Sequence, residues 1–181
     1  MFKNQFFMAI YKICPPIIMS EVKYRISNEY NKRLKLKILI VDDDDNASEL
    51  FKDILELRGH NVITLNEGVS CISNIQRNQY DLIFLDYHIG DIDGVDLADF
   101  IRDIFKSNAL IFAYTGDNSL SAVNKFKQNG MNGALIKPID YNLINTIMTL
   151  IENTNKINTG VINKEIISKL EKINDKSLIC F

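Results

Sequence analysis

The fold is decided by residues 80–94, which read YDLIFLDYHIGDIDG. Four apolar residues in a row, 82–85, are followed by turn-forming residues that end at Gly94. A short apolar run that stops at turn signals is typical of a strand buried on both faces, as in a parallel sheet. Asp86 ends this strand, so a rigid element holds its carboxylate at the rim of the predicted sheet. The carboxylate could act as a nucleophile, ligate a metal or serve as a hydrogen-bonded structural acid.

The composition is that of an ordinary globular protein. The chain has 181 residues, which suits one domain with extensions, and its 46% hydrophobic and 24% charged residues allow a sizeable core. The formal net charge is only −2, so no excess charge draws the whole chain to nucleic acid or to an anionic membrane. We therefore expect neither among its partners.

The cysteines and the first residues bear on the compartment. Cys14, Cys71 and Cys180 are widely separated and show no paired spacing, which predicts a reducing compartment and no structural metal. Residues 1–19 are apolar only in patches and lack a convincing cleavage site, and no stretch is long enough to span a bilayer. These features predict a cytoplasmic protein.

A strand-then-helix pattern repeats five times along the chain. Gly59 and Gly130 end two of the predicted helices. Leu97, Ile101 and Ile104 mark the inner face of the third, and the fourth is marked by Leu120, Val123 and Phe126. This alternation predicts a doubly wound parallel sheet with helices on both faces, joined by right-handed crossovers. The predicted strands are 38–41, 61–65, 82–85, 110–114 and 134–136.

The pattern also divides the chain. Residues 1–35 are predicted to be an N-terminal extension, residues 36–152 the folded domain, and residues 153–181 a linker and a short amphipathic helix. The tail is too short for a second core. Neither extension supplies a predicted strand, so we expect the domain to fold without them.

Polar residues follow four of the five strands. Asp42 and Asp43 end the first, Asp86 the third, Thr115 the fourth and Lys137 the fifth. The carboxyl ends of parallel strands meet at one edge of the sheet, where ligands of such folds bind. Three carboxylates this close repel one another, and a divalent cation relieves that repulsion. Oxygen ligands with room left for water favour Mg²⁺.

The same residues fit a phosphoryl group. A metal ion and Lys137 would neutralise its oxygens, Thr115 would donate a hydrogen bond to one of them, and Asp86 could attack phosphorus. The neighbouring Asp44 and Asp45 precede a helix and are interpreted as its N-terminal cap and first turn.

With these residues in place, the chain resembles the response-regulator receiver domain of two-component signalling. The resemblance covers about residues 37–151. Each motif alone is weak, but four of them in order on the ends of the right strands form a specific pattern. The matching residues are Val41-Asp42-Asp43, Asp86 with Gly94, Thr115-Gly116 and Lys137-Pro138.

The resemblance implies a flavodoxin-like fold with strand order 2-1-3-4-5. It implies that Asp86 accepts a phosphoryl group from phosphohistidine on a histidine kinase or a histidine phosphotransfer protein. It further implies Mg²⁺ bound by Asp42, Asp43, Asp86 and the backbone carbonyl of His88. Thr115 and Lys137 would contact the phosphoryl group. Residues 130–133 look most like those of receivers attached to hybrid histidine kinases.

Two positions depart from the family pattern. Gly90 stands where a proline is usual, and Ala134 stands where an aromatic residue is usual. In the family, that aromatic ring moves when the domain is phosphorylated. Tyr114 cannot replace it, because strand alternation points its ring to the opposite side from Thr115. We therefore expect a weak conformational switch and a stand-alone or phosphorelay role, with a homodimer left open.

Two other functions compete with this one. A phosphatase of the haloacid-dehalogenase type would use Asp42 as nucleophile and Asp44 as acid, but no cap insertion is present and no acidic pair follows Lys137. A receiver-like interaction module that is never phosphorylated would not need the complete acid, threonine and lysine set. We therefore expect no enzymatic activity beyond self-catalysed phosphoryl transfer and autodephosphorylation.

Overall fold

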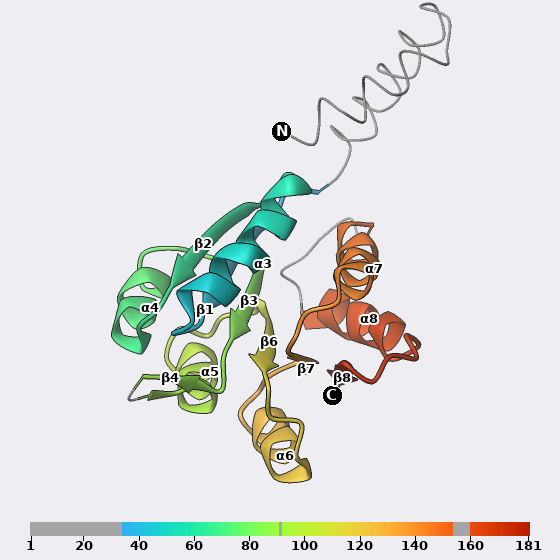
Figure 1. Ribbon diagram of the computed structural model, residues 1–181. Helices are drawn as coiled ribbons and strands as arrows, with labels where there is room; N and C mark the ends of the chain where they lie inside the picture. Colours follow the sequence, from blue (N-terminus) through green and yellow to red (C-terminus); the bar gives the residue numbers. More distant parts are fainter. Residues whose placement is uncertain (1–33, 91, 154–159) are drawn as a thin grey trace, which may run out of the picture. The chain divides into compact units, whose positions relative to one another are not determined.

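One six-stranded sheet organises the structure, a computed structural model that describes residues 34–90, 92–153 and 160–181 (Figure 1). The strands lie in the order β2-β1-β3-β6-β7-β8. The first five are parallel, as predicted, and β8 runs antiparallel to β7. The strands are β1 (Lys37–Val41), β2 (Asn61–Leu65), β3 (Leu82–Leu85), β6 (Leu110–Thr115), β7 (Gly133–Ile136) and β8 (Leu178–Cys180).

Helices cover both faces of this sheet. On one face, Phe51 of α3 packs its ring against those of Phe84 on β3 and Tyr114 on β6, with centroids 4.7 and 5.0 Å away. On the other, α4, α5 and α6 close a large apolar cluster. The helices are α3 (Asp45–Leu57), α4 (Gly68–Ile75), α5 (Gly94–Asp103), α6 (Leu120–Gln128), α7 (Tyr141–Glu152) and α8 (Gly160–Leu170).

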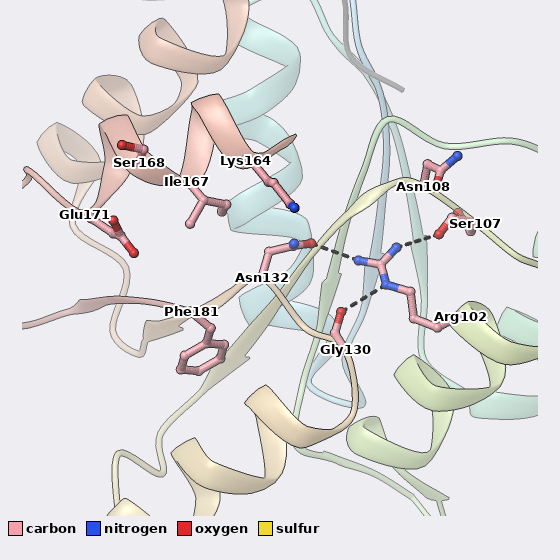
Figure 2. Close-up of a pocket in the computed structure, with 10 residues that line it drawn as sticks. All are labelled: Arg102, Ser107, Asn108, Gly130, Asn132, Lys164, Ile167, Ser168, Glu171 and Phe181. Carbon is pink, nitrogen blue, oxygen red and sulfur yellow. Dashed lines mark hydrogen bonds between the residues drawn. The ribbon is translucent and has the colours of Figure 1, made fainter. Parts of the chain in front are cut away.

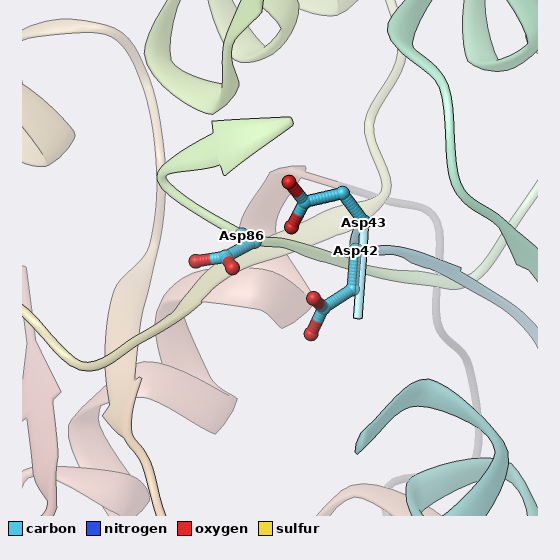
Figure 3. A group of neighbouring side chains, drawn as sticks. All are labelled: Asp42, Asp43 and Asp86. Carbon is cyan, nitrogen blue, oxygen red and sulfur yellow. The ribbon is translucent and has the colours of Figure 1, made fainter. Parts of the chain in front are cut away.

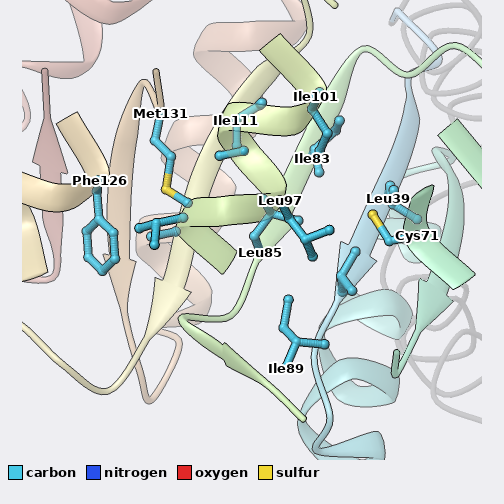
Figure 4. Close-up of a cluster of buried hydrophobic side chains, with 14 of the residues drawn as sticks. Leu39, Cys71, Ile83, Leu85, Ile89, Leu97, Ile101, Ile111, Phe126 and Met131 are labelled. Atoms are coloured by element: carbon cyan, nitrogen blue, oxygen red, sulfur yellow. The ribbon is translucent and has the colours of Figure 1, made fainter. Parts of the chain in front are cut away.

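The apolar cluster shows why the strands are hydrophobic throughout. Leu39, Ile83 and Ile111 come from neighbouring parallel strands and point to the same side, where Leu97 and Phe126 of the helices meet them (Figure 4). Strands buried on both faces need apolar residues at every position, and the central strand β3 is buried at all four. Together with the order of the five parallel strands, this arrangement is the flavodoxin-like α/β fold.

Local signals for helix ends are confirmed at several positions. The Asp44 carboxylate accepts hydrogen bonds from the backbone N–H groups of Asn46 and Ala47, which caps α3. Gly59 follows that helix with φ of 96°, a left-handed conformation that favours glycine. One periodicity prediction is wrong: Ile104, expected on the inner face of the third helix, is 61% exposed, because α5 ends at Asp103 and Ile104 is only its C-terminal cap.

The tail contributes a strand that the sequence analysis did not predict. The Ser177 carbonyl accepts the Ile136 N–H at 2.8 Å, and Leu178 is buried. Gly133 permits this pairing, since a Cβ there would overlap the carbonyl oxygen of Ile179. The predicted C-terminal helix is present as α8, which packs on α7. Lys35–Phe181 forms one compact unit, while the predicted extension, residues 1–35, lies outside the described residues except for its last two.

Arg102 ties this tail region to the rest of the domain. Its guanidinium donates to the carbonyls of Ser107 and Ala109, both at 2.7 Å, and to the Asn132 side chain at 2.8 Å. Burial lowers the pKa of Arg102 to about 10, so it stays charged at neutral pH. The Asn132 carbonyl in turn accepts the Phe181 N–H at 3.1 Å. A cavity of about 420 Å³ lies between these residues and α8 (Figure 2).

A second buried polar network joins α3 to α7. The Glu152 carboxylate lies 2.8 Å from Arg58 Nε and 3.0 Å from His60 Nε2. The Leu36 N–H donates to His60 Nδ1, so the other ring nitrogen carries the proton and donates to Glu152. Burial alone would raise the pKa of Glu152, but the hydrogen bonds from His60 and Arg58 outweigh it and lower that pKa.

The Glu152 network predicts a pH-dependent stability difference. A lowered folded-state pKa stabilises the fold above the usual glutamate value near 4.5, and this stabilisation is lost as the pH falls through the lowered value. Glu152→Gln should cost about 3 kcal/mol of unfolding free energy at pH 7. Urea unfolding of both proteins from pH 7 to pH 3 should show the gap shrinking below about pH 4.5. A gap independent of pH would contradict the assignment.

The strand β8 predicts that the tail stabilises the domain. Leu178→Ala should lower the free energy of unfolding by about 2 kcal/mol, because it removes a buried side chain from the pairing surface with β7. Urea unfolding measures this loss. Lys176→Ala, at an exposed position two residues earlier, is the matched control and should change little. Equal stability of the two variants would restore the view that the domain folds without its tail.

Candidate functional site

Three aspartates meet at the carboxyl edge of the sheet (Figure 3). Asp42 and Asp43 follow β1, and Asp86 follows β3, which pairs directly with β1. One carboxylate oxygen from each lies within 4.8 Å of the others. Backbone hydrogen bonds hold Asp42 and Asp86 in place. The Asp86 N–H donates to the Val41 carbonyl at 2.8 Å, and the Asp42 N–H donates to the Leu65 carbonyl at 3.0 Å.

Lys137 bridges two of these acids. Its Nζ lies 2.7 Å from Asp42 Oδ2 and 2.8 Å from Asp86 Oδ2, and 4.8 Å from the centre of the Tyr114 ring. Burial, the largest single influence, would lower the pKa of Lys137, but the close contacts with the charged Asp42 and Asp86 outweigh it and raise that pKa. The lysine is therefore a permanent positive charge at this edge.

Asp42 is the buried member of the cluster. Its side chain is 0% exposed, and this burial raises the pKa of its carboxyl despite the contacts with Lys137 and the Asp44 N–H. Oδ1 accepts that N–H at 3.0 Å. Oδ2 has the ion pair with Lys137 but no hydrogen bond of good geometry from any described residue. A buried carboxylate oxygen in this condition is suited to a cation.

The donor set fits a hard divalent cation. It consists of carboxylate oxygens only, from one buried, one half-buried and one exposed aspartate, so part of the coordination sphere faces solvent. Mg²⁺ prefers such oxygen ligands and usually retains several waters. The acid cluster predicted from the sequence is thus present, and it can hold a metal ion.

The chain turns sharply after Asp86. The Tyr87 N–H donates to Asp86 Oδ1 at 2.6 Å, and the Gly94 N–H donates to the Tyr87 carbonyl at 2.8 Å. A Cβ at Gly94 would overlap the Asp86 carbonyl oxygen, which explains the glycine eight positions after the aspartate. Between them lie two short strands, β4 (His88–Ile89) and β5 (Ile92–Asp93).

The other predicted site residues lie close by, with different roles in this structure. Thr115 is buried, its Oγ1 accepts the Asp117 N–H at 3.1 Å, and its carbonyl accepts the Lys137 N–H. His88 places a 72% exposed side chain beside Asp93, so its ring points into solvent. The contact of the His88 carbonyl with a metal and that of Thr115 with a phosphoryl group stay predictions.

One neighbouring residue was missed by the sequence analysis. Tyr87 buries its ring against Phe126, and its hydroxyl accepts a hydrogen bond from Lys125 on α6. The available signal was an aromatic residue directly after the strand-end aspartate. Tyr114 is the nearby ring named in the sequence analysis. Its contact with Phe51 of α3 confirms that this ring faces the α3 side of the sheet, away from α6.

Comparison with known proteins agrees with this geometry. Residues 38–149 match the family described as the response regulator receiver domain. The chain belongs to this family. A two-component response regulator from Clostridium difficile has a similar crystal structure, with a TM-score of 0.62 and 28% identity, covering 67% of this chain and 100% of that one. Receiver domains accept phosphoryl groups, so residues 38–149 form a phosphoacceptor domain.

Receivers from larger proteins are also similar. The CAI-1 autoinducer sensor kinase/phosphatase CqsS of Vibrio cholerae is 28% identical over 114 residues, which are 62% of this chain and 17% of that protein. Stress response regulator protein 1 of Candida tropicalis is 32% identical over 110 residues, which are 59% of this chain and 42% of that protein. The chain therefore spans less than half the length of these curated relatives.

The helices that the structure describes include none that is both long and apolar enough to cross a membrane.

The exposed position of Asp43 predicts a metal-specific effect. Asp43→Ala should leave the melting temperature of the metal-free protein unchanged or slightly higher, because it removes one charge from a repulsive cluster. It should greatly reduce the rise in melting temperature that millimolar Mg²⁺ gives the unmodified protein. Thermal melts with and without Mg²⁺ measure both effects, with Asp53→Ala on the exposed side of α3 as control. A large loss of metal-free stability would make Asp43 a structural acid.

Proposed function

We propose that Asp86 accepts a phosphoryl group from phosphohistidine on a histidine kinase or a histidine phosphotransfer protein. The observation that carries this proposal is the Lys137 bridge, which sets a positive charge 2.8 Å from Asp86 Oδ2 beside two further carboxylates. The family match supports phosphoacceptor function, and the geometry supports Asp86 as the residue that performs it.

In the transfer, a carboxylate oxygen of Asp86 forms a new P–O bond while the P–N bond to the donor histidine breaks. The bonding electron pair leaves on the imidazole nitrogen. Lys137 turns from the carboxylates to a phosphoryl oxygen, and the Thr115 hydroxyl donates to another. Catalysis is then mostly positioning and charge neutralisation. Hydrolysis by water later returns the free carboxylate and inorganic phosphate.

Mg²⁺ is the metal that we propose for the acid cluster. Asp42, Asp43, Asp86 and the His88 carbonyl would hold it, and it would supply positive charge to the phosphoryl oxygens. The buried Asp42 oxygen without a well-aligned hydrogen-bond donor supports a cation at this place. Its raised pKa also supports it, because a bound cation favours the ionised carboxylate that burial disfavours.

We further propose a relay or stand-alone role in the cytoplasm, without other enzymatic activity. Ala134 is fully buried in the cluster that faces α6, so its methyl group cannot move outward as a larger ring could. A phosphoryl group shifts a two-state element only through differential contacts, and one such contact is missing here. The phosphoryl group would then serve as cargo more than as a signal.

The phosphatase alternative makes Asp42 the nucleophile. The Asp42 side chain is 0% exposed and that of Asp86 is 15% exposed, so Asp86 is the acid that a partner's phosphoryl group can reach. Burial also raises the pKa of Asp42, which disfavours the ionised carboxylate that a nucleophile needs.

Intact-mass spectrometry tests the assignment directly. Incubation with acetyl phosphate and Mg²⁺ should add one phosphoryl group to the unmodified protein, and chelation of the metal should prevent it. Asp86→Asn should abolish the mass shift, because the amide is not a nucleophile, while Asp42→Asn should still be labelled. Labelling that persists in Asp86→Asn and disappears in Asp42→Asn would favour the phosphatase.

A further inference from the structure

We propose that Tyr87 is a positioning residue for phosphoryl transfer: α6 holds its side chain, which keeps its backbone N–H aimed at the Asp86 carboxylate. This inference rests on Asp86 as the proposed phosphoacceptor. Tyr87 contacts the Asp86 carboxylate through its backbone N–H, and its side chain packs against α6. The residue therefore links the proposed phosphoacceptor to that helix.

The backbone of Tyr87 supplies half of the contacts that orient the Asp86 side chain. Its N–H donates to Oδ1 at 2.6 Å, while Lys137 approaches Oδ2 at 2.8 Å. Two partners on the two oxygens fix the plane of the carboxylate. In the proposed transfer Lys137 turns to the phosphoryl group, so the orientation of the carboxylate then depends on the Tyr87 N–H together with the proposed Mg²⁺.

The side chain of Tyr87 is anchored at two points on α6. Its ring is 7% exposed and meets the ring of Phe126 edge to face, with centroids 5.3 Å apart at 83°. Its hydroxyl accepts a hydrogen bond from Lys125 Nζ at 2.9 Å. That hydrogen bond is the largest influence on Lys125 and raises its pKa, so the lysine is charged at neutral pH.

The segment that follows needs such an anchor. After Tyr87 the chain enters β4 and β5, which are two residues each, and it turns at Gly90 with φ of 60°. A hairpin this short is held by few hydrogen bonds of its own. Tyr87 itself is held by the Gly94 N–H on its carbonyl, by the His88 ring 4.4 Å from its own, and by the contacts of its ring and hydroxyl with α6.

Phosphorylation kinetics of the full chain test the proposal. With phosphoramidate as donor and Mg²⁺ present, Tyr87→Ala should lower the saturating rate about tenfold, because the carboxylate loses its orientation. The half-saturating donor concentration should change less than twofold, since no donor contact is removed. Tyr87→Phe keeps the ring and should recover most of the rate. Lys125→Met removes the same hydrogen bond and also the contact of Lys125 Nζ with the ring, 5.6 Å from its centre. It should therefore lower the rate slightly more than Tyr87→Phe, and the double variant should match Lys125→Met alone.

A spectroscopic signature separates positioning from general stability. In the unphosphorylated, metal-free protein, the amide proton at position 87 should resonate downfield through its short bond to a carboxylate. Tyr87→Ala should move it upfield, and Lys127→Met, an exposed lysine of the same helix, should change neither this resonance nor the rate. If Tyr87→Ala does not fold, Tyr87→Leu, which keeps most of the buried volume, carries the same test.

A folded Tyr87→Ala or Tyr87→Leu with an unchanged saturating rate would overturn the proposal. So would a reduced rate with an unmoved amide resonance at position 87, which would reduce Tyr87 to a packing role. Failure of the proposed function is distinguishable, because the unmodified protein would then show no labelling at Asp86 while the amide resonance still reported the hydrogen bond.

Discussion

The contact of one lysine with two aspartates holds the functional edge together. Parallel strands bring Asp42 and Asp86 to neighbouring positions of the sheet edge, where their charges repel. Lys137, which follows β7, reaches Asp86 across the strand β6 and Asp42 across β6 and β3. The strand order therefore decides which side chains meet, and the charge of the lysine makes their meeting tolerable without a metal.

Sequence reasoning succeeded where one residue has one physical reason to be present. Glycine stands eight positions after Asp86 because the chain returns so closely there that only glycine fits against the Asp86 carbonyl. Lys137 and Asp42 were paired because strand ends share an edge. The faces of the sheet were predictable too, since strands buried on both sides must be apolar throughout.

The same reasoning failed where geometry beyond the local pattern decides. Ile104 fits the helical repeat of α5, but a repeat does not say where the helix ends. The strand at 178–180 has three residues and no alternation, so its pairing depends on the free edge of β7 rather than on its own sequence. In the sequence, Tyr87 is simply the residue after Asp86, and nothing nearby indicates a partner for its ring. The fold supplies that partner by placing Phe126 of α6 beside it.

The antiparallel strand β8 has a consequence for how the protein is made. The five parallel strands occur in one continuous part of the chain, and most of their contacts form between segments that leave the ribosome close together in time. The strand that closes the edge beside β7 comes only after α7 and α8. Until residues 178–180 emerge, the growing chain carries an unpaired strand edge, the kind of surface that favours aggregation of nascent proteins. Translation that pauses before this point would leave a nearly folded domain with the edge of β7 unpaired.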